Sequence, residues 1–129
     1  MKTINVVIVE DRPMARDELK YLLSLHADIN VVGEFENTVS AWPLIASGRI
    51  DGVFLDINIA TESDTAGLDL AYRIDRLPLA NRPWIVFTTG YDEYEAKTKQ
   101  IKHFGYLVKP LDEYKILPIL NKVRQIQHA

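Results

Sequence analysis

Short apolar runs alternate with longer segments of mixed polarity along the whole chain. Four of these runs, at residues 4–9, 53–55, 84–87 and 106–108, consist almost entirely of β-branched, aliphatic or aromatic residues. Apolar runs of this length are typical of parallel strands that are buried on both faces. The pattern therefore predicts a parallel β-sheet whose two faces are covered by other elements.

The longer segments predict the helices that connect these strands. In residues 14–25, for example, Leu19, Leu22 and Leu23 recur at helical spacing and form one apolar face. The complete expectation is strands at residues 3–9, 30–35, 52–55, 84–87 and 105–108, and helices at residues 14–25, from 38 or 40 to 47, 68–77, 92–103 and from 112 onward, with a polar loop at residues 60–67.

Five strand–helix units in succession indicate an α/β fold, because helices of this length serve as crossovers between parallel strands. The expected architecture is a flavodoxin-like (βα)5 doubly wound parallel sheet with strand order 2-1-3-4-5. Residues 1–129 are expected to form a single domain, since the sequence shows no internal repeat, linker or low-complexity segment. In this order the first and third strands are neighbours, and the fifth strand lies two places from the third.

Two of the helices are expected to be irregular. The segment 92–103 is mostly polar and has a thin apolar face that includes Ala96 and Ile101. The last helix is expected to start near Asp112, a residue type that caps helix N-termini well. Pro118 lies inside this helix, where proline loses one hydrogen bond and clashes with the preceding turn. The helix is therefore either kinked at Pro118 or begins one residue before it.

Side chains suited to phosphate chemistry follow four of the expected strands. Glu10 and Asp11 come after the first strand, Asp56 after the third, Thr89 after the fourth and Lys109 after the fifth. In an open α/β sheet, ligands bind beyond the carboxyl ends of the strands. We therefore expect three carboxylates, a hydroxyl and an amine to converge on one crevice, with the lysine long enough to reach across from the fifth strand.

A divalent cation would relieve the repulsion among three neighbouring carboxylates. Mg²⁺ prefers oxygen ligands and is often shared between one or two carboxylates and a phosphate. Asp56 is the best candidate nucleophile, because a carboxylate can accept a phosphoryl group as an aspartyl phosphate. Thr89 and Lys109 would bind oxygens of that group, and Gly90 would leave room for a backbone N–H to approach it.

Composition and charge exclude several other classes of function. The chain has no cysteine, which rules out disulfides, thiolate zinc sites and cysteine nucleophiles. Its formal net charge is −3 and its Lys and Arg residues are spread along the sequence, so charge gives no reason to expect direct nucleic-acid binding. The first apolar run is too short for a signal peptide or a membrane span. We expect a soluble cytoplasmic domain that does not bind membranes.

These features together resemble the receiver domain of bacterial two-component response regulators, and the resemblance covers nearly all of the chain. The segment 87–94 is most similar to receivers that usually accompany a LytTR-type DNA-binding domain, so the chain is either a stand-alone receiver or one excised from a longer regulator. The resemblance rests on four motifs in the family's order at the ends of the expected strands: Glu10-Asp11, Asp56, Thr89-Gly90 and Lys109-Pro110.

The resemblance implies roles for the acidic residues. Asp56 would accept a phosphoryl group from a phosphohistidine on a sensor histidine kinase or a phosphotransfer protein. Mg²⁺ or Mn²⁺ would be bound directly by Asp11 and Asp56, through water by Glu10, and by the backbone carbonyl of Asn58. The domain would support only its own phosphorylation and dephosphorylation, with no other enzymatic activity.

The resemblance also implies a conformational switch. Thr89 and Lys109 would contact the phosphoryl oxygens, and Tyr106 would turn inward as Thr89 moves toward the phosphoryl group. The peptide bond between Lys109 and Pro110 would be cis. The fourth helix, fifth strand and fifth helix would form the output face, through which a homodimer could also assemble.

Some features depart from the family pattern, and other functions remain open. Residues 57–60 lack the Met-Pro pair common in receivers, and the loop that follows looks a few residues longer than usual. A Mg²⁺-dependent phosphohydrolase of the haloacid-dehalogenase kind also uses a strand-end aspartate, but it places Asp-x-Asp near its first strand. A phosphorylation-independent interaction module on the same fold usually lacks one of the acids or the lysine. A nucleotide-binding Rossmann domain is disfavoured because no Gly-x-Gly follows the first strand.

Overall fold

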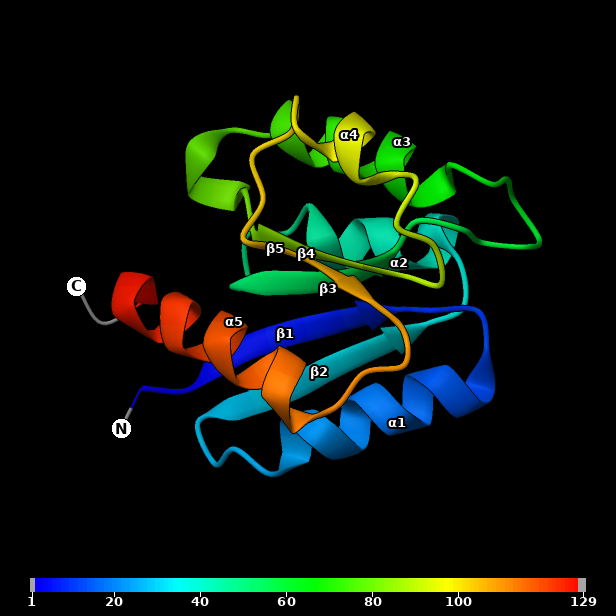
Figure 1. The fold of residues 1–129 in the computed structure, drawn as a ribbon. Coiled ribbons are helices and arrows are strands. Elements are labelled where there is room, and N and C mark those ends of the chain that lie inside the picture. The colour runs from blue at the N-terminus through cyan, green and yellow to red at the C-terminus, as the bar shows by residue number, and fades with distance from the viewer. Residues whose placement is uncertain (1, 128–129) are drawn as a thin grey trace.

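Five parallel strands form one sheet in the order β2-β1-β3-β4-β5 in the computed structural model, which describes residues 2–127 (Figure 1). The predicted α/β class and strand order are therefore confirmed. The central strands β1 and β3 are almost completely buried, as their apolar sequences predict. The strands are β1 (Ile4–Val9), β2 (Ile29–Phe35), β3 (Gly52–Asp56), β4 (Trp84–Thr89) and β5 (Gly105–Val108).

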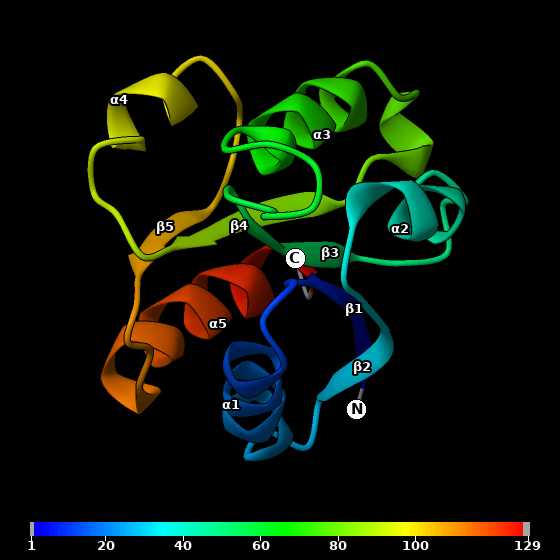
Figure 2. The same ribbon diagram turned by 90° about the vertical axis from the view of Figure 1, so that its right-hand side faces the viewer.

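Helices cover both faces of this sheet, as Figure 2 shows most clearly. Two helices, α1 and α5, pack on one face, and α2, α3 and α4 lie on the other. The helices are α1 (Pro13–Ser24), α2 (Thr38–Ile45), α3 (Ala66–Asp75), α4 (Glu95–Thr98) and α5 (Glu113–Gln127), with a short 3₁₀ turn at Leu79–Asn81.

Alternate residues of the central strands enter two separate cores. Val7 and Val9 of β1 pack beneath α2 and α3, whereas Ile8 packs beneath α1 and α5. In β3, Leu55 packs in the core beneath α2 and α3, and Phe54 packs in the core beneath α1 and α5. Successive side chains of a strand point to opposite faces of the sheet. Burial of both faces fixes the register, since a slip of one residue would exchange the two cores.

The register brings the carboxyl ends of the central strands level with one another. Val9, the last residue of β1, pairs with Leu55 of β3, and Asp56 pairs with Thr88 of β4. Thr89 in turn pairs with Val108 at the end of β5. The residues that follow these strands therefore emerge at one edge of the sheet.

The predicted helix at 92–103 is wrong in its extent, because α4 comprises only four residues. The Thr98 hydroxyl donates to the Glu95 carbonyl at 2.7 Å, and the backbone beyond it forms a single turn to Ile101. Ile101 is buried as predicted, but Ala96 is exposed. A segment this polar has little apolar area to bury, and most helical stability in proteins comes from such packing.

The structure shows where the helix that contains Pro118 begins. The helix α5 begins at Glu113, after Asp112, whose side chain accepts a hydrogen bond from the Lys115 backbone at 2.9 Å. A start one residue before Pro118 is therefore wrong, and the helix continues through the proline. Pro118 lies on the exposed side of α5, where water can satisfy the carbonyl of Tyr114 that loses its partner.

Candidate functional site

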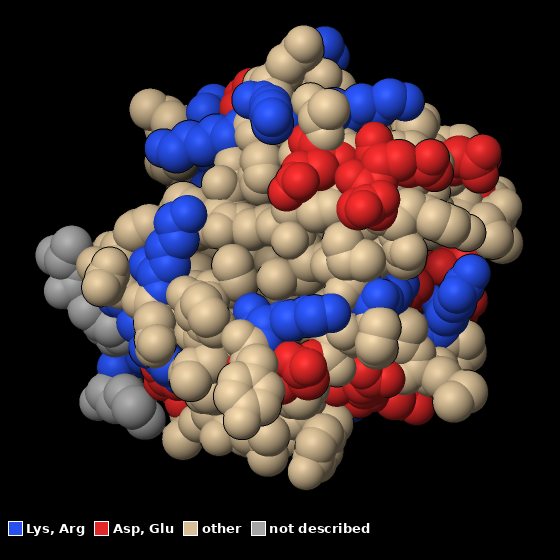
Figure 3. All heavy atoms as spheres, viewed as in Figure 1, with Lys and Arg blue, Asp and Glu red and all other residues tan. Residues whose placement is uncertain are grey.

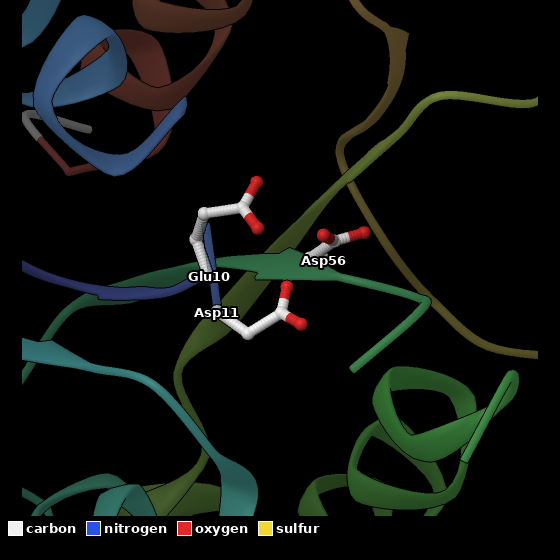
Figure 4. Close-up of side chains that lie close together, drawn as sticks. All are labelled: Glu10, Asp11 and Asp56. Carbon is white, nitrogen blue, oxygen red and sulfur yellow. The ribbon is translucent and has the colours of Figure 1, made fainter. Parts of the chain in front are cut away.

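Three carboxylates lie together at the carboxyl edge of the sheet, around a common space (Figure 4). Glu10 and Asp11 follow β1, and Asp56 is the last residue of the adjacent strand β3. One oxygen from each carboxylate lies within 4.8 Å of the others. Glu10 and Asp56 are 2% and 3% exposed, so their charges interact through protein rather than through bulk water. The expected convergence of the acids from the first and third strands is found.

Lys109 reaches this cluster from the end of β5, two strands away from β3. Its Nζ donates to Asp56 Oδ2 at 3.1 Å and also forms an ion pair with Glu10 Oε1. One ammonium therefore pairs with two nearly buried carboxylates, and the Asp11 carboxylate lies beside them. With all groups ionised, the four side chains have a net charge of −2, which suits a divalent cation.

The pKa values reflect this crowding. Burial, and after it the nearby Asp56, raise the pKa of Glu10 from 4.5 to about 7 against the opposing effect of Lys109. Burial tends to lower the pKa of Lys109, but its hydrogen bond to Glu10 and the charge of Asp56 outweigh burial and hold it above the ordinary value. The crowding thus disfavours the ionised form of Glu10 when no cation is present, and a cluster of carboxylate oxygens of this kind fits Mg²⁺.

The backbone around Asp56 is held tightly. The Asn58 N–H donates to Asp56 Oδ1 at 3.2 Å, so both carboxylate oxygens have a partner. Gly67, the second residue of α3, packs directly against this backbone, and a Cβ there would collide with the Asp56 carbonyl oxygen. The sequence marked Gly67 only as part of a polar loop, and no local signal showed that this contact requires a glycine.

Thr89 lies beside the acids but hydrogen-bonds to another residue. It is fully buried, and its hydroxyl donates to Asn58 Oδ1 at 3.1 Å. The Tyr106 hydroxyl donates to the Tyr91 carbonyl at 2.5 Å. The peptide bond that joins Lys109 to its proline is cis. The site therefore contains all of the expected side chains, and Thr89 is connected to Asp56 through Asn58 by two hydrogen bonds.

Hydrogen bonds connect the loop after β3 to its surroundings. The Ala60 N–H donates to Asp11 Oδ2 at 2.9 Å, which ties the loop to the acidic cluster. Farther along, the Glu62 carboxylate accepts hydrogen bonds from the Thr38 N–H at 2.9 Å and the Thr38 hydroxyl at 2.7 Å. These contacts fix the loop between the acids and the N-terminus of α2.

The surface charge agrees with the even distribution in the sequence. On the face drawn in Figure 3, Lys and Arg side chains lie in several separate groups with neutral or acidic surface between them. This face of the described residues therefore presents no continuous basic patch of the kind that binds a phosphate backbone. Among residues 2–127, no helix has both the length and the apolar character needed to cross a membrane.

A doubly wound sheet with an acidic cluster and a lysine at its carboxyl edge fits the receiver class that the sequence resembles. The chain belongs to the response regulator receiver domain family, whose model matches residues 6–121. Family membership confirms the resemblance described above and favours the receiver interpretation over the phosphohydrolase.

Two curated relatives agree with this membership. The chain is 38% identical to the sensory transduction protein LytT of Enterococcus faecalis over 119 residues, which cover 92% of this chain and 47% of the relative. It is also 38% identical to the transcriptional regulatory protein BtsR of Escherichia coli K12 over 122 residues, 95% of this chain and 48% of the relative. The chain thus spans about half the length of these relatives.

A solved structure agrees with the fold in detail. The response regulatory domain of mrkE from Klebsiella pneumoniae superposes with a TM-score of 0.83 at 31% identity, covering 95% of this chain and 97% of the other. The match therefore extends over the whole five-stranded architecture.

Proposed function

We propose that Asp56 accepts a phosphoryl group in a reaction that depends on a divalent cation, and that this modification switches the domain in two-component signalling. The observation that supports this most strongly is Lys109 Nζ, 3.1 Å from Asp56 Oδ2, beside two further carboxylates. Phosphoryl transfer requires mainly positioning and neutralisation of charge. A lysine and a cation site that flank one strand-end carboxylate can provide both.

The transfer forms one bond and breaks one. An oxygen of Asp56 attacks the phosphorus of a phosphohistidine, the P–N bond breaks, and the released imidazole takes up a proton. In this proposal Lys109 and Thr89 bind phosphoryl oxygens, so that negative charge is neutralised where it accumulates. Mg²⁺ or Mn²⁺ supplies further neutralisation when it is bound by Asp11, Asp56 and the Asn58 carbonyl, with Glu10 acting through water.

The proposal extends to partners and output. The phosphodonor is a sensor histidine kinase or a phosphotransfer protein, and the output face comprises α4, β5 and α5, through which two copies can pair. We assign any contact with DNA to a separate effector domain of the whole regulator. The relatives are about twice as long as this chain, and BtsR is named a transcriptional regulatory protein, which supports this assignment. A cytoplasmic location is also part of the proposal.

The test is labelling by a small phosphodonor. With Mg²⁺ and acetyl phosphate, the wild-type protein should gain one base-labile phosphoryl group, measured by intact mass spectrometry. Asp56→Asn should abolish the gain, and a chelator should suppress it. Asp64→Asn, an exposed position in the adjacent loop, is the matched control and should label normally. Normal labelling of Asp56→Asn would contradict the proposal.

A further inference from the structure

A continuous series of hydrogen bonds leads from the loop after β3 to Tyr106. The Asn58 side-chain amide donates to the Asp64 carbonyl at 2.7 Å, and its oxygen accepts from the Thr89 hydroxyl at 3.1 Å. The Thr89 oxygen accepts from the Tyr91 N–H at 3.2 Å. The Tyr91 carbonyl accepts from the Tyr106 hydroxyl at 2.5 Å. Asn58 is thus the link between the loop and the buried threonine.

The orientation of the Asn58 amide is determined by its two partners. The Asp64 carbonyl can only accept, so the amide nitrogen must face it, and the amide oxygen is left to face Thr89. Thr89 is 0% exposed, so water cannot easily replace a partner that its hydroxyl loses. The Asn58–Thr89 bond is therefore a specific and costly contact to break.

A threonine hydroxyl has a single hydrogen to donate. While Thr89 donates to Asn58 Oδ1, it cannot donate to an oxygen of a group attached to Asp56. Movement of the Thr89 hydroxyl toward Asp56 must break this bond, and it also displaces the acceptor of the Tyr91 N–H. Tyr91 also carries the carbonyl that accepts from the Tyr106 hydroxyl, so the same residue connects Thr89 to Tyr106.

We propose that the Asn58 side chain is a positioning residue that holds Thr89 in the unphosphorylated arrangement and so sets the energetic threshold of the switch. This inference rests on the proposed function, because it assigns a regulatory contact to the same site. Removing the amide should raise the population of the arrangement in which Thr89 faces Asp56. One net hydrogen bond corresponds to a change of about fivefold in that population.

The experiment uses the isosteric variant Asn58→Leu, and Asn58→Ala as a second variant should the leucine protein fold poorly. The probe is beryllium fluoride with saturating Mg²⁺, and its apparent dissociation constant should fall about fivefold, because apparent affinity scales with the competent fraction. A second readout, without beryllium fluoride, is the NMR shift of the Tyr91 amide, which should change in the variant.

Glu62→Ala is the matched control. It removes two hydrogen bonds that anchor the same loop to Thr38 but has no contact with Thr89. It should leave both the beryllium fluoride affinity and the Tyr91 amide unchanged. If Glu62→Ala reproduces the effects of Asn58→Leu, loop mobility is the cause and the inference is wrong.

Two further outcomes overturn the inference without affecting the proposed function. One is an unchanged NMR shift of the Tyr91 amide in the Asn58 variants. In that case any altered affinity for beryllium fluoride would come from a direct contact between residue 58 and the fluoride. The other is an unchanged affinity in variants that still label at Asp56. Failure of the wild-type protein to label at all would instead refute the proposed function, and the Tyr91 readout would still test the Asn58–Thr89 contact.

Discussion

Replacement of Lys109 with methionine is expected to destabilise the protein when no divalent cation is present. The Lys109 ammonium lies 3.1 Å from Asp56 Oδ2, which corresponds to an attraction of about 5 kcal/mol at an effective dielectric constant of about 20. The ammonium is also desolvated in the site, which offsets part of this attraction. Breaking one side of a buried ion pair costs about 3–5 kcal/mol. We expect the lower end, about 3 kcal/mol, because Glu10 can take up a proton in partial compensation.

The assay is urea unfolding followed by tryptophan fluorescence at pH 8 with a chelator, and then with Mg²⁺. Lys115→Met is the matched control, because Lys115 lies close by but donates to the Val108 and Pro110 carbonyls at 2.7 Å rather than to a carboxylate. Mg²⁺ should restore much of the stability lost in Lys109→Met and little in the control. Equal losses of stability in the two variants, or no effect of Mg²⁺, would show that Lys109 does not neutralise the buried carboxylates.

The remaining predictions concern pH and packing. Without divalent ions, the free energy of unfolding of the wild type relative to Glu10→Gln should fall by about 3 kcal/mol between pH 4.5 and about 7. In this range Glu10 keeps a proton in the folded protein that the unfolded chain has released. A difference between the two proteins that stays constant with pH in urea unfolding would contradict this. Gly67→Ala should lower the free energy of unfolding by more than about 2 kcal/mol and impair labelling. In Gly90→Ala the new Cβ would have no neighbour within 4 Å, so the stability measured by thermal unfolding should stay within about 0.5 kcal/mol of the wild type. The hydrogen bonds from Arg124 lower the pKa of Asp28, so Arg124→Met should destabilise the folded protein by about 2 kcal/mol at pH 7. This loss should shrink below pH 3.8 as Asp28 becomes protonated. A loss of stability that does not depend on pH would argue against the ion pair.

The sheet and the acidic cluster were predictable because both follow from short apolar runs. A run such as 53–55 must be buried on both faces, and that requirement leaves few arrangements of five parallel strands. Once the order was fixed, Asp11 and Asp56 had to be neighbours, and only a side chain as long as Lys109 could reach them from the fifth strand. These inferences need only the strand ends, which the sequence marks clearly.

The features that the sequence did not predict depend on contacts between distant segments. The short extent of α4 was missed because a polar segment can form a helix or a loop with similar local preference. The contact of Gly67 with the Asp56 backbone and the Asn58–Thr89 hydrogen bond both join residues across the loop after β3. No periodicity reports such contacts, since they depend on the exact path of the backbone.

The most direct test of the proposed function is a crystal structure of the protein with Mg²⁺ and beryllium fluoride. We expect beryllium on a carboxylate oxygen of Asp56, with the metal bound by Asp11, Asp56 and the Asn58 carbonyl. Lys109 and the Thr89 hydroxyl should each contact a fluoride, and the Asn58–Thr89 hydrogen bond should be broken. Beryllium on another carboxylate, or a metal bound away from Asp11 and Asp56, would contradict it.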